Sequence, residues 1–555
     1  MSPNVQREVT TNRLLKSMQE MREDVLEQVN DRINDMMSEV RQRIVTEKEV
    51  PAKENKYDDK RQSNEEGTLP AKVFLPRNSM LTDFSLSIDH SLSTDNMSVN
   101  SKSLSMFAFL TFYRQSNEEG TLPAKVFLPR NSMLTDLMQI SHIQTVYNIC
   151  MMTFILLFLN TVAHDLMDTG MLFVGTCTVQ KAFGKFPVCF YIWLLMKIST
   201  LVLYVPFNIW AYQRIEFSPK SLLQKVWDYA WLITFISYQI LFVVFPTKAL
   251  LDEDLPVACS VIILMEQTRL MMKSYAFVRN VGAKFVLYKS HAETLKPSSP
   301  SFSHYLYFLF APTLIYRDSY PRTKEIRWKV VIRSFIELGL VIFYQAFIME
   351  RFVAPTFRIF GTQSLDWRWY MKSILSAMMP GILISVSSFY GLLHAWMNAW
   401  AEMLRFADRL FYKDWWNCTS YRAYYRTWNV TVHDWLYTYV YKDMYEILSP
   451  RNKVLATYAV FFISSIFHEY ILAFTFRFFY PVLLIMFGGF GFVLMFNRYF
   501  TGNVFMWTSL CIGKGIAVSM YAMEYYARIN CQPYDDKYLD LVLPRSWFCR
   551  PLSGT

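Results

Sequence analysis

The chain has 555 residues, of which 53% are hydrophobic and 17% aromatic, and only 17 are glycine. This composition excludes an ordinary soluble globular protein and indicates an integral membrane protein. The net charge is +10, yet residues 1–140 hold 18 Lys and Arg against 21 Asp and Glu, so the rest carries about +13, which suits anionic lipid, a phosphate-bearing substrate or simply positive cytoplasmic loops.

Residues 1–50 are predicted to contain one long helix. Within 13–45 the apolar residues recur every three or four positions and form a single stripe, at Leu14, Met18, Met21, Val25, Val29, Ile33, Met36, Val40 and Ile44. No apolar signal sequence precedes it, so the first membrane segment is expected to direct its own insertion and to leave the N-terminus cytosolic. The stripe predicts self-association, and a helix lying on the membrane or on the chain's own body is the alternative.

Residues 51–138 are polar and rich in Ser and Asn, and are expected to form a disordered cytosolic linker. They contain an identical duplication, RQSNEEGTLPAKVFLPRNSMLTD, at residues 61–83 and again at 114–136. Two copies without an apolar face do not make a solenoid. The repeat indicates a recent duplication or a gene-model error, and it has no evident function.

Residues 139–528 are expected to form an all-α, polytopic bundle of about nine transmembrane helices. The apolar segments are each near the ~20 residues that cross a bilayer, and they lie at 145–163, 185–209, 226–246, 255–275, 329–350, 372–400, 454–475, 481–499 and 503–525. An odd number of spans after a cytosolic N-terminus places the tail, residues 529–555, in the lumen. Cys531 and Cys549 would meet an oxidising compartment there and are expected to form a disulfide.

The segment FFISSIFHEYILAF, residues 461–474, places His468 and Glu469 inside an apolar run. Ionisable groups at membrane depth are costly and usually face a polar cavity or a partner. Ser464 lies one turn before His468 on the same helix face. A buried neutral histidine can act as a general base, and a hydrogen-bonded structural histidine is the alternative. A metal site is not expected, because the sequence has no HxxxH or CxxC pair.

The second polar feature is FYKDWWNCTSYRAYYRTWNVTVHDW, residues 411–435. Aromatic side chains of this density are typical of a membrane–water interface, and an anchoring helix is the plain interpretation. That interpretation does not explain the polar residues among them, Asp414, Asn417, Arg426, Asn429, His433 and Asp434. Cys418 is a weak candidate nucleophile. The glycosylation triplets at Asn96, Asn417 and Asn429 are discounted, because they are expected in the cytosol or the membrane.

The residues alone thus predict a histidine-containing site among C-terminal membrane helices, which fits a lipid-modifying enzyme, a transporter or a channel. The motifs FYKDWWN at 411–417, WNVTVHDW at 428–435 and FHEY at 467–470 together resemble the membrane-bound O-acyltransferase family. The segments FLFAPTLIYRDSYPR at 308–322, AEMLRFADRLFYKDWWN at 401–417, YYRTWNV at 424–430 and PRSWFCR at 544–550 favour its sterol O-acyltransferase branch. The resemblance extends from about residue 130 to the end.

The resemblance implies transfer of a long-chain fatty acyl group from acyl-CoA to the 3-hydroxyl of cholesterol or a related sterol, which yields a sterol ester for storage. Acyl-CoA is a co-substrate, and no cofactor is expected. His468 would take the hydroxyl proton, and Asn429 would hold the thioester or its developing oxyanion. The implied acyl-CoA path contains Arg426, Asn429, His433, Tyr441, Lys453 and Ser464.

Other residues have supporting roles by resemblance. His142 matches a position associated with sterol. The motif residues Phe411, Tyr412, Asp414, Trp415, Trp416 and Asn417 are expected to support the site: Asp414 and Asn417 would brace neighbouring helices, and the two tryptophans would pack at the tunnel mouth. Ala423 departs from the family, some members of which have a polar residue there, so one contact with CoA is expected to be missing.

The family further implies a multi-pass protein of the endoplasmic reticulum membrane that forms dimers or tetramers. The expected partners are long-chain acyl-CoA, sterol, membrane lipid and further copies of the chain, with no nucleic acid. Two alternatives stay open: a diacylglycerol or wax-alcohol O-acyltransferase of the same family, which shares the FYxDWWN signature and the histidine, and a non-catalytic sterol- or lipid-binding membrane protein.

Overall fold

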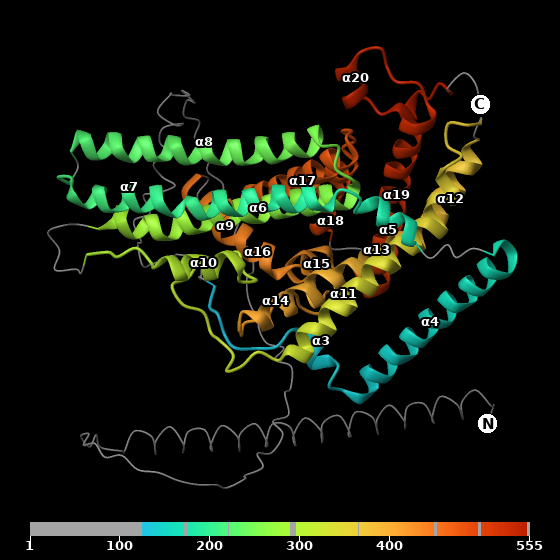
Figure 1. Ribbon diagram of the computed structural model, residues 1–555, viewed down its shortest axis with the longest axis horizontal. Helices are drawn as coiled ribbons and strands as arrows, with labels where there is room; N and C mark the ends of the chain where they lie inside the picture. The colour runs from blue at the N-terminus through green and yellow to red at the C-terminus, as the bar shows by residue number, and fades with distance from the viewer. Residues whose placement is uncertain are drawn as a thin grey trace, which may run out of the picture. The chain divides into compact units, whose positions relative to one another are not determined.

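A computed structural model describes residues 125–551, apart from 171–174, 220, 289–295, 364–365, 449–451 and 498–500. Throughout these residues the fold is helical and contains no β-strand, as expected (Figure 1). The predicted helix within 1–50 and the first copy of the duplication lie outside the described residues. So do residues 114–124 of the second copy.

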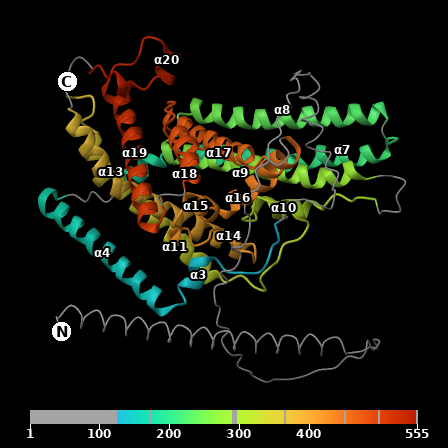
Figure 2. The same cartoon turned by 180° about the vertical axis from the view of Figure 1, so that it is seen from behind.

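The N-terminal half of the described chain contains long helices joined by short connections. Their bounds are α3 Met133–Leu137, α4 Ser141–Thr169, α5 Thr176–Ala182, α6 Phe186–Val202, α7 Tyr204–Glu216, α8 Leu222–Asp252, α9 Val257–Leu287 and α10 Phe302–Phe310. Figure 1 shows α6 and α7 end to end along one line below α8, and both views show α8, α9 and α17 running in roughly the same direction (Figures 1 and 2).

The C-terminal half alternates long helices with short π-helical and 3₁₀ pieces. The bounds up to the second signature motif are α11 Trp328–Ile348, η1 Met349–Val353, α12 Ala354–Phe357, α13 Trp367–Ser388, η2 Phe389–Trp396, α14 Met397–Met403, η3 Trp415–Asn417, α15 Tyr421–Thr427 and α16 Val430–Leu436. The remaining elements are η4 Tyr437–Tyr441, η5 Met444–Leu448, α17 Lys453–Phe476, η6 Leu484–Gly491, α18 Phe492–Met495, α19 Asn503–Asn530, α20 Lys537–Val542 and η7 Arg545–Trp547.

Seven helical stretches in the described part are long and apolar enough to cross a membrane. They are 141–168, 186–216, 222–252, 328–357, 367–403, 453–476 and 503–530. Each overlaps one of the nine expected segments. The other two expected segments are also helical but differ in character: α9 carries several charges, and the last apolar helix before α19, Leu484–Met495, is short. The count of nine spans therefore stays a prediction.

Helix α9 lies in the core of the bundle. Residues on much of its length are buried, including the polar side chains of Gln267, Lys273 and Ser274. The Lys273 ammonium donates to the backbone carbonyls of Phe308, Leu309 and Ala311 at 2.6, 3.1 and 2.7 Å. Since these carbonyls lie at the C-terminal end of α10, the cation satisfies groups that a helix end leaves without partners. The charges of α9 thus fasten α10 to the bundle.

The last residues of the expected linker belong to the folded body, which corrects the prediction of disorder up to residue 138. The Arg130 guanidinium contacts both carboxylate oxygens of the buried Asp408, at 2.6 and 3.2 Å. The ring of Phe127 packs against Tyr320, with centroids 5.2 Å apart. These contacts hold residues 125–132 against the chain just before FYKDWWN and lead into α3.

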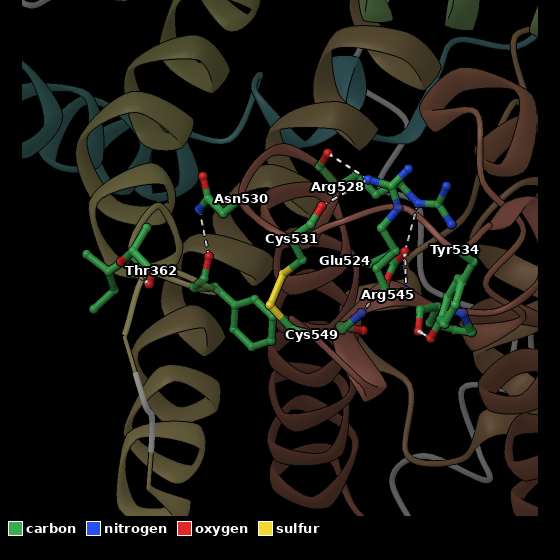
Figure 3. The surroundings of a disulfide bond; sticks show 12 residues. Thr362, Glu524, Arg528, Asn530, Cys531, Tyr534, Arg545 and Cys549 are labelled. Atoms are coloured by element: carbon green, nitrogen blue, oxygen red, sulfur yellow. Dashed lines mark hydrogen bonds and ion pairs between the residues drawn. A yellow bond between two sulfur atoms is a disulfide. The ribbon is translucent and has the colours of Figure 1, made fainter. Parts of the chain in front are cut away.

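The C-terminal tail is closed by a disulfide between Cys531 and Cys549, the two cysteines that the sequence places there (Figure 3). The Glu524 carboxylate accepts from the Arg528 side chain and from the backbone N–H groups of Arg545 and Ser546. Gly361 has a φ of +83°, and a Cβ at this position would lie 2.7 Å from the Cys531 sulfur. A glycine is therefore needed where the loop after α12 crosses the disulfide.

Candidate active site

A cavity of about 2640 Å³ penetrates the helical bundle. It is lined mainly by apolar side chains from α6, α9, α15, α16, η4, α17, η6 and α19. Pockets for small ligands usually measure roughly 300–1,000 Å³. The cavity therefore has room for two lipid-sized molecules at once.

His468 lies on α17 and faces this cavity. Its Nδ1 atom is 2.7 Å from the backbone carbonyl oxygen of Ser464, one turn earlier. Because a carbonyl oxygen can only accept, Nδ1 must carry the proton, and in the neutral ring Nε2 then keeps its lone pair. The helix thus holds the imidazole as a proton acceptor. The Phe487 ring of η6 lies beside it, with ring centroids 5.5 Å apart.

Glu469, the neighbour of His468, is buried and does not face the cavity. Its carboxylate accepts from the Tyr521 hydroxyl at 3.0 Å and from the backbone N–H of Leu484 at 3.1 Å. It therefore joins α17 to α19 and η6. Glu469 thus positions α17, and His468 stays the predicted proton acceptor.

Asn429 is the N-cap of α16 and lines the same cavity. Its side-chain oxygen accepts from the backbone N–H of Val432 at 3.1 Å, which is the usual way that Asn satisfies a helix start. The amide nitrogen is then the remaining hydrogen-bonding group of this side chain. The structure therefore brings a proton acceptor and an N–H donor to one cavity, as predicted for His468 and Asn429.

The predicted acyl-CoA residues also gather around the cavity. Arg426, His433, Tyr441, Lys453 and Ser464 all line it. The ring of Tyr437 stacks between His433 and Tyr441, with centroid distances of 6.3 and 5.5 Å, and forms a ladder along one helix face. Cationic and aromatic groups of this kind suit a phosphate-bearing, nucleotide-containing molecule.

An ion pair anchors this wall of the cavity. Lys125 contacts the carboxylate of Asp434 at 2.5 Å, and His433 approaches the same carboxylate from the other side at 3.5 Å. Burial alone would raise the pKa of Asp434, but the hydrogen bonds and charges of His433 and Lys125 hold that pKa below its ordinary value. Asp434 therefore stays ionised and ties the segment before α3 to α16.

The FYKDWWN motif lies behind the cavity rather than at its mouth. Trp415 is buried and packs on Trp428, which does line the cavity, with centroids 4.5 Å apart. Neither Trp415 nor Trp416 is among the lining residues, so their expected place at the tunnel mouth is corrected. The motif supports the site through a second layer of aromatic packing.

The other residues of the FYKDWWN motif fall into two groups, one buried and one exposed. Phe411 and Tyr412 are buried in the same core, and the Tyr412 hydroxyl lies 2.6 Å from Nδ1 of His394. Asp414 and Asn417 are exposed, and within the described residues no hydrogen bond of their side chains braces a neighbouring helix. The expected bracing therefore comes from the buried aromatic members of the motif.

Other sequence candidates lie away from the cavity. His142 is exposed on α4 and is not a lining residue, so its association with sterol stays a prediction without geometric support. Cys418 is buried behind the cavity, and burial raises the pKa of its thiol, which disfavours a thiolate nucleophile. Ala423 does not line the cavity either. Among the described residues no cluster of side chains is suited to hold a metal ion.

Two functional groups at the cavity escaped the sequence analysis. Lys514 of α19 and Trp547 of the disulfide-closed tail both line it. Lys514 was recognisable, because it is an ionisable residue within an apolar segment, the same signal that identified His468. Trp547 had no such signal, since only folding of the tail brings it to the cavity.

Known proteins resemble this chain over most of its length. Residues 182–523 match the membrane-bound O-acyltransferase family. The chain is 40% identical to sterol O-acyltransferase 1 of Mus musculus over 475 residues, which cover 83% of this chain and 86% of the relative. It is 40% identical to sterol O-acyltransferase 2 of Mus musculus over 440 residues and 39% identical to that of Homo sapiens over 434 residues. These two alignments each cover 77% of this chain and, respectively, 81% and 80% of the relative.

Proposed function

The chain belongs to the membrane-bound O-acyltransferase family, and from this premise we propose that it transfers a long-chain fatty acyl group from acyl-CoA to the 3-hydroxyl group of a sterol. The observation that carries the proposal is the imidazole of His468, whose Nδ1–H donates to a backbone carbonyl and whose Nε2 has no hydrogen bond to any described residue, in a cavity large enough for both substrates. The names of the similar proteins support a sterol as acceptor.

The reaction follows from the groups at the cavity. Nε2 of His468 takes the proton of the sterol hydroxyl while the hydroxyl oxygen attacks the thioester carbonyl carbon. The amide N–H of Asn429 donates to the carbonyl oxygen as that oxygen becomes negative. The C–S bond then breaks, and the departing CoA sulfur takes the proton from the imidazolium. A thiol has a pKa near 8.5 and leaves readily, so no acyl-enzyme is required.

The cationic residues of the cavity would orient the bound acyl-CoA. Arg426 and Lys453 would face the phosphates of CoA, and the ring ladder of His433, Tyr437 and Tyr441 would lie along its nucleotide end. The acyl chain would then extend toward the apolar lining. Ser464 would lie beside the thioester, because it precedes His468 by one helical turn.

The proposal extends to location and assembly. We place the protein in the endoplasmic reticulum membrane as a multi-pass, homo-oligomeric enzyme with a cytosolic N-terminus and a lumenal tail. A cytosolic N-terminus agrees with the polar first residues, and a lumenal tail agrees with the disulfide between Cys531 and Cys549.

A direct acceptor assay tests the function. Membranes containing the full chain would be given labelled acyl-CoA with cholesterol, diacylglycerol or a long-chain alcohol, singly and in competition. We expect labelled sterol ester as the main product. Triacylglycerol without sterol ester would identify diacylglycerol as the acceptor, and wax ester without sterol ester would identify the long-chain alcohol. Saturable sterol binding without any acyl transfer would overturn the proposal that the chain is an enzyme.

A further inference from the structure

Lys514 is a cationic residue in the middle of α19, a helix that is otherwise suited to cross the membrane. It lines the cavity, and within the described residues its ammonium group has no ion pair or hydrogen bond. A charge at this depth is costly unless it meets a partner or serves a function. The buried lysine of α9 differs in this respect, because the ammonium group of Lys273 donates hydrogen bonds to three backbone carbonyls.

The backbone at Lys514 is held in place by close packing of α13 on α19. A Cβ on Gly381 of α13 would lie 3.1 Å from the carbonyl carbon and oxygen of Lys514. A Cβ on Gly515 would lie 2.6 Å from Cγ of Met378 and 3.0 Å from the carbonyl oxygen of Ile374. Two glycines, one on each helix, thus let α13 and α19 pack closely at this lysine. The contact between α13 and α19 fixes the backbone position of Lys514, and its side chain extends to the cavity.

Lys514 and His468 line the same cavity, and seven residues further along α19 the Tyr521 hydroxyl contacts Glu469, the neighbour of His468, so α19 packs on α17 beside the imidazole. The carboxylate of Glu469 is not the counterion of Lys514, because that group is engaged by Tyr521 and the backbone of Leu484. A cation beside a general base opposes protonation of the base. Such a cation assists the reaction only if negative charge develops nearby at the same time.

Resting on the proposed acyl transfer, we propose that Lys514 is a further catalytic residue whose ammonium group stabilises the negative charge that develops on the reacting thioester. The sterol hydroxyl gives its proton to His468, the new C–O bond forms, and the C–S bond breaks with its electron pair on sulfur. Lys514 keeps its protons throughout and acts by its charge. It complements Asn429, which supplies a neutral N–H donor.

The experiment compares the purified full chain with three variants at this position. K514M has a similar length without charge, K514Q keeps a hydrogen-bond donor without charge, and K514R keeps the charge. We expect kcat of K514M and of K514Q to fall about 100-fold, as for loss of one oxyanion-stabilising group, while KM for acyl-CoA and sterol changes less than about threefold. K514R should recover at least about a tenth of the native kcat.

Binding and folding controls make the outcome decisive. Melting temperature and affinity for a non-reactive thioether analogue of acyl-CoA are measured for each variant, and we expect K514M to keep both. The proposal is overturned if K514M or K514Q keeps kcat within twofold of native, or if the loss appears in KM alone. If K514M does not fold, K514Q and K514R decide by the same criteria. Native protein that makes no sterol ester would instead contradict the proposed function.

Discussion

The side-chain oxygen of Asn429 accepts a hydrogen bond from the backbone N–H of Val432, 3.1 Å away, so the amide nitrogen is the group that Asn429 can offer to the cavity. One residue therefore starts α16 and supplies a donor. The two roles use different atoms and can be separated by substitution.

N429D should preserve the helix cap and abolish the donor. Asp caps a helix as well as Asn does, so the melting temperature should stay near the native value. Acyl transfer should fall by about 10²–10³, because the N–H that meets the developing oxyanion is lost. N429S is the matched uncharged variant, since Ser also caps. Native turnover in both N429D and N429S would remove Asn429 from the chemistry.

The pair of Arg130 and Asp408 should contribute measurably to stability. Asp408 is buried, and breaking a buried pair leaves an uncompensated charge at about 3–5 kcal/mol. Because the Arg130 side chain is 34% exposed, we expect about 2 kcal/mol for R130M, seen as a lower melting temperature. The control is K284M, which breaks the exposed pair of Lys284 and Asp318 and should change little. Equal effects of R130M and K284M would show that residues 125–132 are not fastened by this pair.

The disulfide should stabilise the C-terminal tail. A bridge between residues 18 apart is worth about 3 kcal/mol in the chain-entropy description. The double variant C531S/C549S should melt at a lower temperature, and C511S, which removes a free cysteine, should not. If reducing agent lowers the melting temperature of the double variant as much as that of the native protein, the effect arises elsewhere.

The contact of Asp540 with Arg545 should make stability depend on acid pH. The Arg545 guanidinium donates to both carboxylate oxygens at 2.7 and 2.6 Å, and this hydrogen bonding lowers the pKa of Asp540. A carboxyl whose folded pKa lies below its unfolded value of about 3.9 stabilises the fold above that unfolded value. The contribution is lost as the pH falls through the folded pKa. The difference in melting temperature between native protein and D540N should therefore be largest near neutral pH and should shrink below about pH 4. A difference that stays constant or grows in acid would contradict this account.

The sequence identifies the candidate reacting residues more readily than it predicts how the helices pack around them. His468 is recognisable as an ionisable group in an apolar run, and Asn429 lies in a specific motif, because both signals are local. Lys514 obeys the same rule, but its place in the same cavity as His468 depends on how α17 and α19 pack. The place of Trp415 behind Trp428 likewise depends on packing, which spacing along the chain does not encode.

The number of spans cannot be read from apolar content alone, because charged residues on a long helix can find partners inside the protein. Helix α9 is long enough to cross a bilayer, yet its charged residues find partners inside the protein, including Lys197 and Arg269 around Glu266. A linear sequence does not reveal these partners. For the same reason residues 125–132 look like linker, although Arg130 has a partner 278 positions away.

The most direct test of the central claim is turnover of H468A beside S464A in membranes supplied with labelled acyl-CoA and cholesterol. S464A keeps the backbone carbonyl that orients the imidazole, so any loss it shows should appear in KM for acyl-CoA rather than in kcat, whereas the kcat of H468A should fall about 10²–10⁴-fold with its binding of the thioether analogue intact. Sterol ester formed by H468A at the native rate would show that this imidazole does not carry the proton.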